Sequence, residues 1–163
     1  GIGCLYVAED INMNPLLYGG EQERKRRPGT ENVINIIGFQ KAVELAVTHQ
    51  AERIEAYHSY KAQFLQVLED NAIQYSVNGD LTSSVPSIIN ISFPDTHVEV
   101  LLTNLDLEGV AASSGSACTA GSVEPSHVLT AMYGEDVRTT NAIRFSFGLA
   151  NSKENVDIEC RKK

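Results

Sequence analysis

The stretch Ser87-Ile-Ile-Asn-Ile-Ser-Phe93 is β-like, and it marks the point at which the period of the apolar residues changes. Pro94-Asp95 ends this predicted strand. Upstream of it the pattern is helical. A helix is predicted to begin near Thr30 to Asn32, which supply capping side chains, and to run, unbroken or in two pieces, to about Asp70.

Further elements are predicted on both sides of this junction between helix and strand. They are a buried strand at 3–8, a helix at 97–105, a short strand at 109–112, a helix at about 124–133, a strand at 142–147 and the start of a helix at 152. The order of β, long α, β, α, β, loop, α, β and α is typical of a layered α/β or α+β domain.

Composition excludes several classes of protein. The chain has 163 residues, of which 42% are hydrophobic, so it can bury a sizeable core. A net charge of -8 and a pI near 4.9 argue against a general nucleic-acid binder. No apolar run approaches membrane length, and no signal peptide is expected. Because the first residue is not Met, we expect a processed or engineered piece of a longer protein.

One cysteine stands out by its surroundings. Ser113-Ser-Gly-Ser-Ala-Cys118-Thr-Ala-Gly-Ser122 contains no large apolar side chain that could anchor it in a core. Such a segment is typical of a loop that reaches solvent, where a thiolate can act as a nucleophile. The alternative, that Cys118 is a small buried hydrophobe, fits this composition less well.

The other two cysteines carry less information. Cys4 is expected to be buried in the first strand, and Cys160 to be an incidental thiol near the end of the chain. Because no CxxC pair exists, neither a zinc ribbon nor a redox dithiol is expected, and we predict no metal site. Three separated cysteines fit free thiols in a reducing compartment.

Two basic features are candidates for anion binding. Arg144 lies inside the apolar strand Ile143-Arg144-Phe145-Ser146, so its guanidinium needs a partner. An incoming carboxylate and a structural ion pair with a nearby Glu or Asp are equally compatible with the strand. Arg24-Lys25-Arg26-Arg27-Pro-Gly-Thr30 precedes a helix and is compatible with a phosphate site or with a solvated charge run.

Five motifs, taken together, resemble those of the cysteine desulfurases and occur in the order that this family shows. They are Gly19-Gly20-Glu21-Gln22-Glu23-Arg24, Arg27-Pro28-Gly29-Thr30-Glu31-Asn32-Val33, Ser113-Ser-Gly-Ser-Ala-Cys118, Glu124-Pro125-Ser126-His127-Val128-Leu129 and Ile143-Arg144-Phe145-Ser146-Phe147-Gly148. The resemblance covers nearly the whole chain. Its Ser-Ser-Gly-Ser-Ala-Cys loop points to the C-terminal portion of a group I, NifS/IscS-like enzyme.

The resemblance implies a fold and a domain organisation. The fold is that of fold-type I aminotransferases dependent on pyridoxal 5'-phosphate (PLP). It is α/β, with an α+β small domain and a mixed sheet packed with helices. Residues 1–30 would end the PLP-binding large domain, 31–72 would form a connecting long helix, and 73–163 would form the small C-terminal domain with the cysteine loop 113–122.

The resemblance also implies a reaction and its site residues. The family is homodimeric and uses PLP as an electron sink to release sulfur from L-cysteine, leaving L-alanine. Cys118 matches the catalytic cysteine that receives the sulfur as a persulfide. Arg144 matches the arginine that binds the substrate carboxylate, and Thr30 matches a residue that reaches the PLP phosphate of the neighbouring subunit.

The chain departs from the family pattern in its lysines. The lysine that forms the Schiff base is expected to precede Gly1, and the lysines present stand in other contexts. They are Lys25, Lys41, Lys61, Lys153, Lys162 and Lys163. The chain by itself is therefore expected to be inactive.

The acceptor of the sulfur is expected to be an iron–sulfur scaffold or a tRNA-thiolation enzyme. Direct contact with nucleic acid or membrane is not expected, and the implied compartment is the cytoplasm. Two alternatives remain open. A stand-alone sulfur-relay or docking module would need only Cys118 and a surface. A selenocysteine lyase-like PLP enzyme would carry the same residues.

Overall fold

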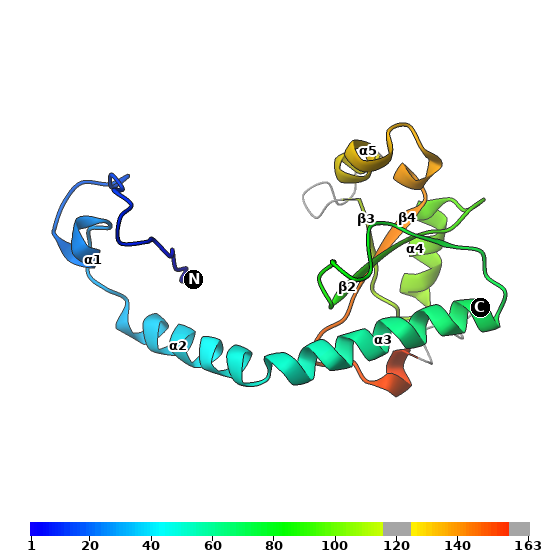
Figure 1. Ribbon diagram of the computed structural model, residues 1–163, viewed down its shortest axis with the longest axis horizontal. Coiled ribbons are helices and arrows are strands. Elements are labelled where there is room, and N and C mark those ends of the chain that lie inside the picture. Colours follow the sequence, from blue (N-terminus) through cyan, green and yellow to red (C-terminus); the bar gives the residue numbers. More distant parts are fainter. Residues whose placement is uncertain (116–124, 157–163) are drawn as a thin grey trace. The chain divides into compact units, whose positions relative to one another are not determined.

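A computed structural model describes residues 1–115 and 125–156 (Figure 1). The chain divides into two compact units, residues 1–50 and residues 51–163. Among the described residues, no helix is long and apolar enough to span a bilayer.

The first unit contains two helices, α1 (Gln22–Lys25) and α2 (Val33–Thr48). As predicted, α2 begins directly after a capping side chain, since Asn32 Oδ1 accepts a hydrogen bond from the Asn35 N–H at 3.2 Å. The strand predicted at residues 3–8 is wrong, because these residues have no regular secondary structure and most are exposed. A strand needs a neighbour to satisfy its backbone groups, and no described strand pairs with this segment.

The predicted long helix is confirmed in its two-piece form. α2 ends at Thr48, and α3 runs from Gln50 to Asp70. The junction is His49, whose φ of -102° and ψ of 10° are not helical. Only the second helix has a buried face among the described residues, formed by Lys61, Phe64, Val67 and Leu68.

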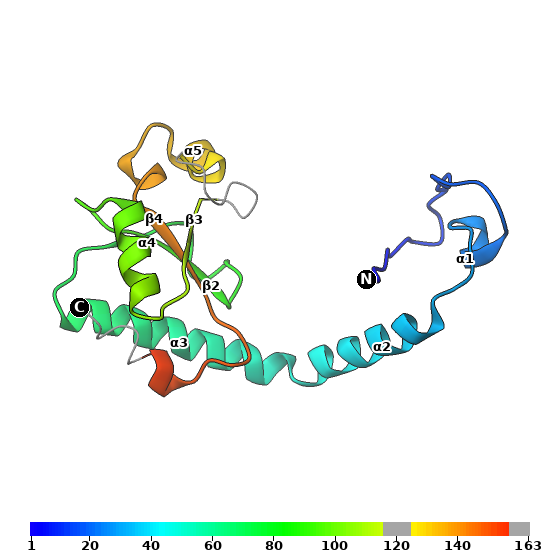
Figure 2. The ribbon, with the colours of Figure 1, turned by 180° about the vertical axis from the view of Figure 1, so that it is seen from behind.

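The second unit is built on a four-stranded sheet in the order β1-β2-β4-β3. Figure 2 labels the strands β2, β3 and β4 of this sheet. Its strands are β1 (Ser76–Val77), β2 (Ile88–Ser92), β3 (Ser113–Ser114) and β4 (Ala142–Ser146). The helices are α3, α4 (Val98–Leu107), α5 (His127–Tyr133) and the short 3-10 helix η2 (Val137–Thr139). Residues 153–156 form a further helical turn.

The two central strands divide apolar from polar side chains. Successive side chains of a strand point to opposite faces, so Ile89 and Ile91 share one face of β2, and Ile143 and Phe145 share the same face of β4. All four are buried. Phe64 of α3 lies against Phe145, with ring centroids 4.8 Å apart.

This apolar face forms the core of the unit. The cluster also includes Leu68, Phe93, Phe147 and Val156, and four apolar side chains of α4 pack against it: Val98, Leu101, Leu102 and Leu105. Helices α3 and α4 thus cover one face of the sheet. Burial of each such side chain contributes about 1.5–3 kcal/mol relative to leaving it in water.

The structure confirms the α/β class and corrects three details. The expected mixed sheet is antiparallel throughout its four described strands. The strand expected at 109–112 lies instead at Ser113–Ser114, because the register with β4 pairs these two residues with Arg144 and Ile143. The helix expected to begin near 124 begins at His127, where the Ser126 hydroxyl accepts a hydrogen bond from the Leu129 N–H at 3.4 Å.

A turn stabilised by Asp80 follows β1. Its carboxylate accepts hydrogen bonds from the Thr82 N–H, at 2.9 Å, and from the hydroxyls of Thr82 and Ser83, both at 2.8 Å. These bonds, the backbone one foremost, lower the pKa of Asp80 from its ordinary value of 3.8. The turn therefore depends on the ionised form of Asp80.

We expect Ile143→Ala to lower the free energy of unfolding of the second unit by about 2–5 kcal/mol, because it leaves a cavity in the core. The side chain of Ile143 is 0% exposed, whereas Ile88, on the other face, is 39% exposed. Ile88→Ala is the control and should cost about 0.5 kcal/mol. Urea denaturation followed by circular dichroism measures both. Equal losses in the two variants would contradict the assignment of faces.

Asp80→Asn should weaken the dependence of stability on acid. The folded pKa of Asp80 is depressed, so its contribution is present above pH 3.8 and is lost as the pH falls through the folded value. Urea midpoints measured at decreasing pH should fall less steeply for Asp80→Asn than for the unchanged chain. Asp95→Asn, on another turn, is the control. An unchanged slope in Asp80→Asn would refute the role of the carboxylate.

Candidate active site

The face of the sheet opposite the core is polar and carries Arg144. In the register of the sheet, Arg144 of β4 lies directly opposite Asn90 of β2 on one side and Ser113 of β3 on the other. Paired residues of an antiparallel sheet point to the same face, so the three side chains form a row across the sheet. Arg144 and Asn90 are half-buried, and Ser113 is exposed.

The guanidinium of Arg144 is held weakly. Its Nη1 donates a hydrogen bond to the Gly115 carbonyl at 3.4 Å, which is long for this kind of contact. Within residues 1–115 and 125–156 no carboxylate forms an ion pair with it. The structural ion pair considered from the sequence is thus not found among these residues.

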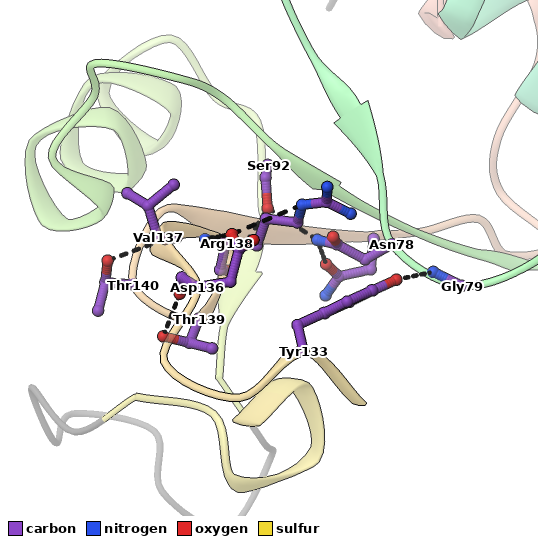
Figure 3. Close-up of polar contacts among 10 residues, drawn as sticks. Asn78, Gly79, Ser92, Tyr133, Asp136, Val137, Arg138, Thr139 and Thr140 are labelled. Carbon is purple, nitrogen blue, oxygen red and sulfur yellow. Dashed lines mark hydrogen bonds and ion pairs between the residues drawn. The ribbon is translucent and has the colours of Figure 1, made fainter. Parts of the chain in front are cut away.

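A side-chain network continues the polar row toward β1 (Figure 3). Asn78 Nδ2 donates to Asn90 Oδ1 at 2.7 Å and to Ser92 Oγ at 2.8 Å. The Ser92 hydroxyl in turn donates to the Arg138 carbonyl at 3.4 Å. Asn78 is also fixed by its backbone, whose N–H donates to the Asn90 carbonyl at 2.9 Å. These asparagines were not identified from the sequence.

Tyr133 and Arg138 support the outer end of this network. The Tyr133 hydroxyl accepts a hydrogen bond from the Gly79 N–H at 2.9 Å, next to Asn78 (Figure 3). The guanidinium carbon of Arg138 lies 4.8 Å from the centroid of the Tyr133 ring, a cation–π contact. Asp136 Oδ1 lies 3.6 Å from Arg138 Nε. These contacts join α5 and η2 to the turn that presents Asn78.

Thr30 belongs to the first unit and lies between a turn and the start of α2. Gly29, at a φ of 104°, donates its N–H to Gln22 Oε1 at 3.1 Å and so fixes the turn. Thr30 is exposed, and its hydroxyl has no hydrogen-bond partner in the described part of the chain. The hydroxyl is therefore free to contact a phosphate near the N-terminus of α2.

The cysteines differ in what the structure says about them. Cys118 and Cys160 lie outside the described residues. Cys4 is exposed, which corrects the expectation of a buried strand residue and follows from the missing strand. The described residues contain no cluster of three or more His, Cys, Asp or Glu side chains suited to a metal ion.

Three of the described lysines have their ammonium groups engaged in hydrogen bonds or ion pairs. Burial lowers the pKa of Lys61, a property that Schiff-base lysines share. However, its ammonium donates to the Val85 carbonyl at 2.8 Å and to Ser84 Oγ at 3.3 Å. Lys25 and Lys41 form exposed ion pairs with Glu21 and Glu44. Lys61 therefore has a structural role, because its hydrogen bonds hold Ser84 and Val85, after the Asp80 turn, against α3.

Comparison with known proteins adds independent findings. The aminotransferase class-V family matches residues 1–158. A Bacillus subtilis (strain 168) protein named putative cysteine desulfurase IscS 1 is 55% identical over 157 residues, which are 96% of this chain and 41% of that protein. The chain thus spans less than half the length of this relative.

Two solved structures of other proteins also superpose on this chain. A NifS-like protein superposes with a TM-score of 0.79 at 30% sequence identity. The match covers 96% of this chain and 40% of the NifS-like chain. The structure titled SspA in complex with cysteine superposes with a TM-score of 0.53 at 27% identity, over 82% of this chain and 35% of its own.

Proposed function

The chain belongs to the aminotransferase class-V family, and on this premise we propose that it is part of a PLP-dependent cysteine desulfurase. The enzyme would take sulfur from L-cysteine, hold it as a persulfide on Cys118 and pass it on. The 55% identity to a protein named a cysteine desulfurase supports this activity. Within the structure, Arg144 is the observation that carries it, because its guanidinium lies on the polar face without a carboxylate partner in residues 1–115 and 125–156.

In this proposal Arg144 orients the substrate and Cys118 is the nucleophile. A guanidinium can hold the carboxylate of L-cysteine by two parallel hydrogen bonds. The Cys118 thiolate bonds to the substrate sulfur while the bond between that sulfur and its carbon breaks. The electron pair of the broken bond stays on carbon, and a proton completes L-alanine. The persulfide then gives its outer sulfur to an acceptor thiol.

When bound, PLP supplies the electron sink that makes this carbon a tolerable leaving group. Thr30 fits a contact to the cofactor phosphate, since its hydroxyl is exposed beside the N-terminus of α2. The lysines of this chain stand in sequence contexts other than that of the family's Schiff-base lysine. The covalent anchor of the cofactor is therefore not assigned to Lys25, Lys41, Lys61 or Lys153.

The wider setting follows from the same proposal. Residues 1–30, 31–72 and 73–163 would be the end of the large domain, the connecting helix and the small domain with the cysteine loop 113–122. The enzyme would be a homodimer in which Thr30 contacts the PLP phosphate of the neighbouring subunit. The sulfur would pass in the cytoplasm to an iron–sulfur scaffold or a tRNA-thiolation enzyme.

Substitutions in the PLP-loaded enzyme test the two roles. Cys118→Ser should abolish formation of a protein-bound persulfide, because a hydroxyl does not accept the sulfur. Arg144→Lys keeps the charge but loses the planar fork, so kcat/KM for L-cysteine should fall by about 10-fold or more. Cys4→Ser, at an exposed thiol, is the control. Persulfide on Cys4 rather than Cys118 would contradict the proposal.

The 163-residue chain, mixed with PLP and L-cysteine, is expected to release no L-alanine. Its lysines stand in sequence contexts other than that of the family's Schiff-base lysine, and Lys61 is already hydrogen-bonded. Chromatographic detection of alanine measures this. Steady turnover, with a cofactor band that borohydride fixes to the protein, would show that one of these lysines serves after all.

A further inference from the structure

We propose that Asn90 binds the substrate carboxylate together with Arg144, a role that rests on the proposed function. Asn90 and Arg144 are direct partners in the register of β2 and β4. Such partners have Cβ atoms about 4.5–5.5 Å apart and point to the same face. The side chains of Asn90 and Arg144 therefore extend from adjacent strands on the same polar face, and both are half-buried. In the structure Arg144 Nη1 donates toward Gly115, on the β3 side, so an anion held by both residues would lie between the guanidinium and the Asn90 amide.

The orientation of the Asn90 amide is set from the opposite side. Strand β2 lies between β1 and β4, and Asn78 follows β1 directly. Asn78 Nδ2 donates to Asn90 Oδ1 at 2.7 Å, which occupies the amide oxygen on the β1 side. The amide nitrogen of Asn90, with its two hydrogens, is left for the side of Arg144. Within residues 1–115 and 125–156 that nitrogen donates no hydrogen bond.

One atom of this side-chain network, the amide oxygen of Asn78, is buried and has no hydrogen-bond partner in the described part of the chain. A buried acceptor without a donor is unfavourable. The Asn78 amide donates both of its hydrogens, to Asn90 and to Ser92, while its oxygen accepts none among the described residues.

The chemistry of the pair selects an anion with two oxygens. The guanidinium and the amide nitrogen are both donors only, so they cannot bond to each other. A carboxylate can accept from both at once, one oxygen facing each group. The two residues would discriminate an amino acid with a free carboxylate from the same compound with that group blocked.

A titration of the full chain by nuclear magnetic resonance tests this, with no cofactor needed. L-Alanine, which carries the carboxylate, is compared with L-alaninamide, which does not. In the isotope-labelled chain, L-alanine alone should shift the Nε–H signal of Arg144 and the side-chain amide signal of Asn90 along the same binding curve. Ser146→Ala, on the same face of β4, is the control and should bind as the unchanged chain does.

Two variants then isolate Asn90. Asn90→Ala should weaken the binding of L-alanine by about 10- to 100-fold, the usual effect of one hydrogen bond to a charged group. Asn90→Asp keeps the acceptor for Asn78 and so protects the fold, but it puts a negative charge beside Arg144. It should lose more binding than Asn90→Ala. Arg144→Gln should abolish binding.

The outcomes separate the two proposals. If Arg144→Gln abolishes binding while Asn90→Ala and Asn90→Asp bind L-alanine as the unchanged chain does, the role of Asn90 is refuted and that of Arg144 stands. If L-alaninamide shifts the same signals equally, or if L-alanine leaves the Arg144 signal unmoved, the carboxylate site itself is refuted and the role of Asn90 with it.

Discussion

The antiparallel pairing of β2 with β4, in the register that sets Ile91 against Ile143, is the constraint on which the second unit depends. Because side chains alternate between faces, this register places the isoleucines and Phe145 under α3 and α4. It places Asn90 and Arg144 together on the other face. A slip by one residue would bury the guanidinium and expose the core, so the packing of the core also fixes the site.

Lys61 and Arg144 are two cations of this unit that differ in how their charge is satisfied. Lys61 is almost fully buried, and its ammonium donates to the Val85 carbonyl at 2.8 Å and to Ser84 Oγ at 3.3 Å. Arg144 is half-buried, and the one side-chain hydrogen bond that it forms within the described residues is a long one to a carbonyl. A perturbed pKa alone would have pointed to Lys61. Unsatisfied donor capacity on an accessible face points to Arg144.

Local pattern was enough to predict some elements and not others. The two-piece helix and the strands around Ile89 and Ile143 follow from periodicity and capping, which are local properties. The error at residues 3–8 has a different origin, since an apolar run becomes a strand only when a neighbour pairs with it. The shift of β3 to Ser113 and Ser114 arises in the same way, because its position is set by β4.

Of the two residues proposed to bind the carboxylate, only Arg144 was predicted from the sequence. Arg144 was conspicuous as a charge among apolar residues, whereas Asn90 in Ser87-Ile-Ile-Asn-Ile-Ser-Phe93 looked like an ordinary strand residue. The alternation of Ile89, Asn90 and Ile91 indicates that Asn90 faces away from the core. Its pairing with Arg144 can be read only from the register of β2 and β4, which pairs residues more than fifty positions apart in the sequence. The contact of Asn78 with Asn90 depends, in addition, on the turn after β1.

The most direct test of the account is a crystal structure of the PLP-loaded enzyme with L-cysteine or an unreactive analogue bound. The account predicts the substrate carboxylate within hydrogen-bond distance of the Arg144 guanidinium on the polar face of the sheet. A carboxylate bound elsewhere, with Arg144 paired to an Asp or Glu of the protein, would contradict it.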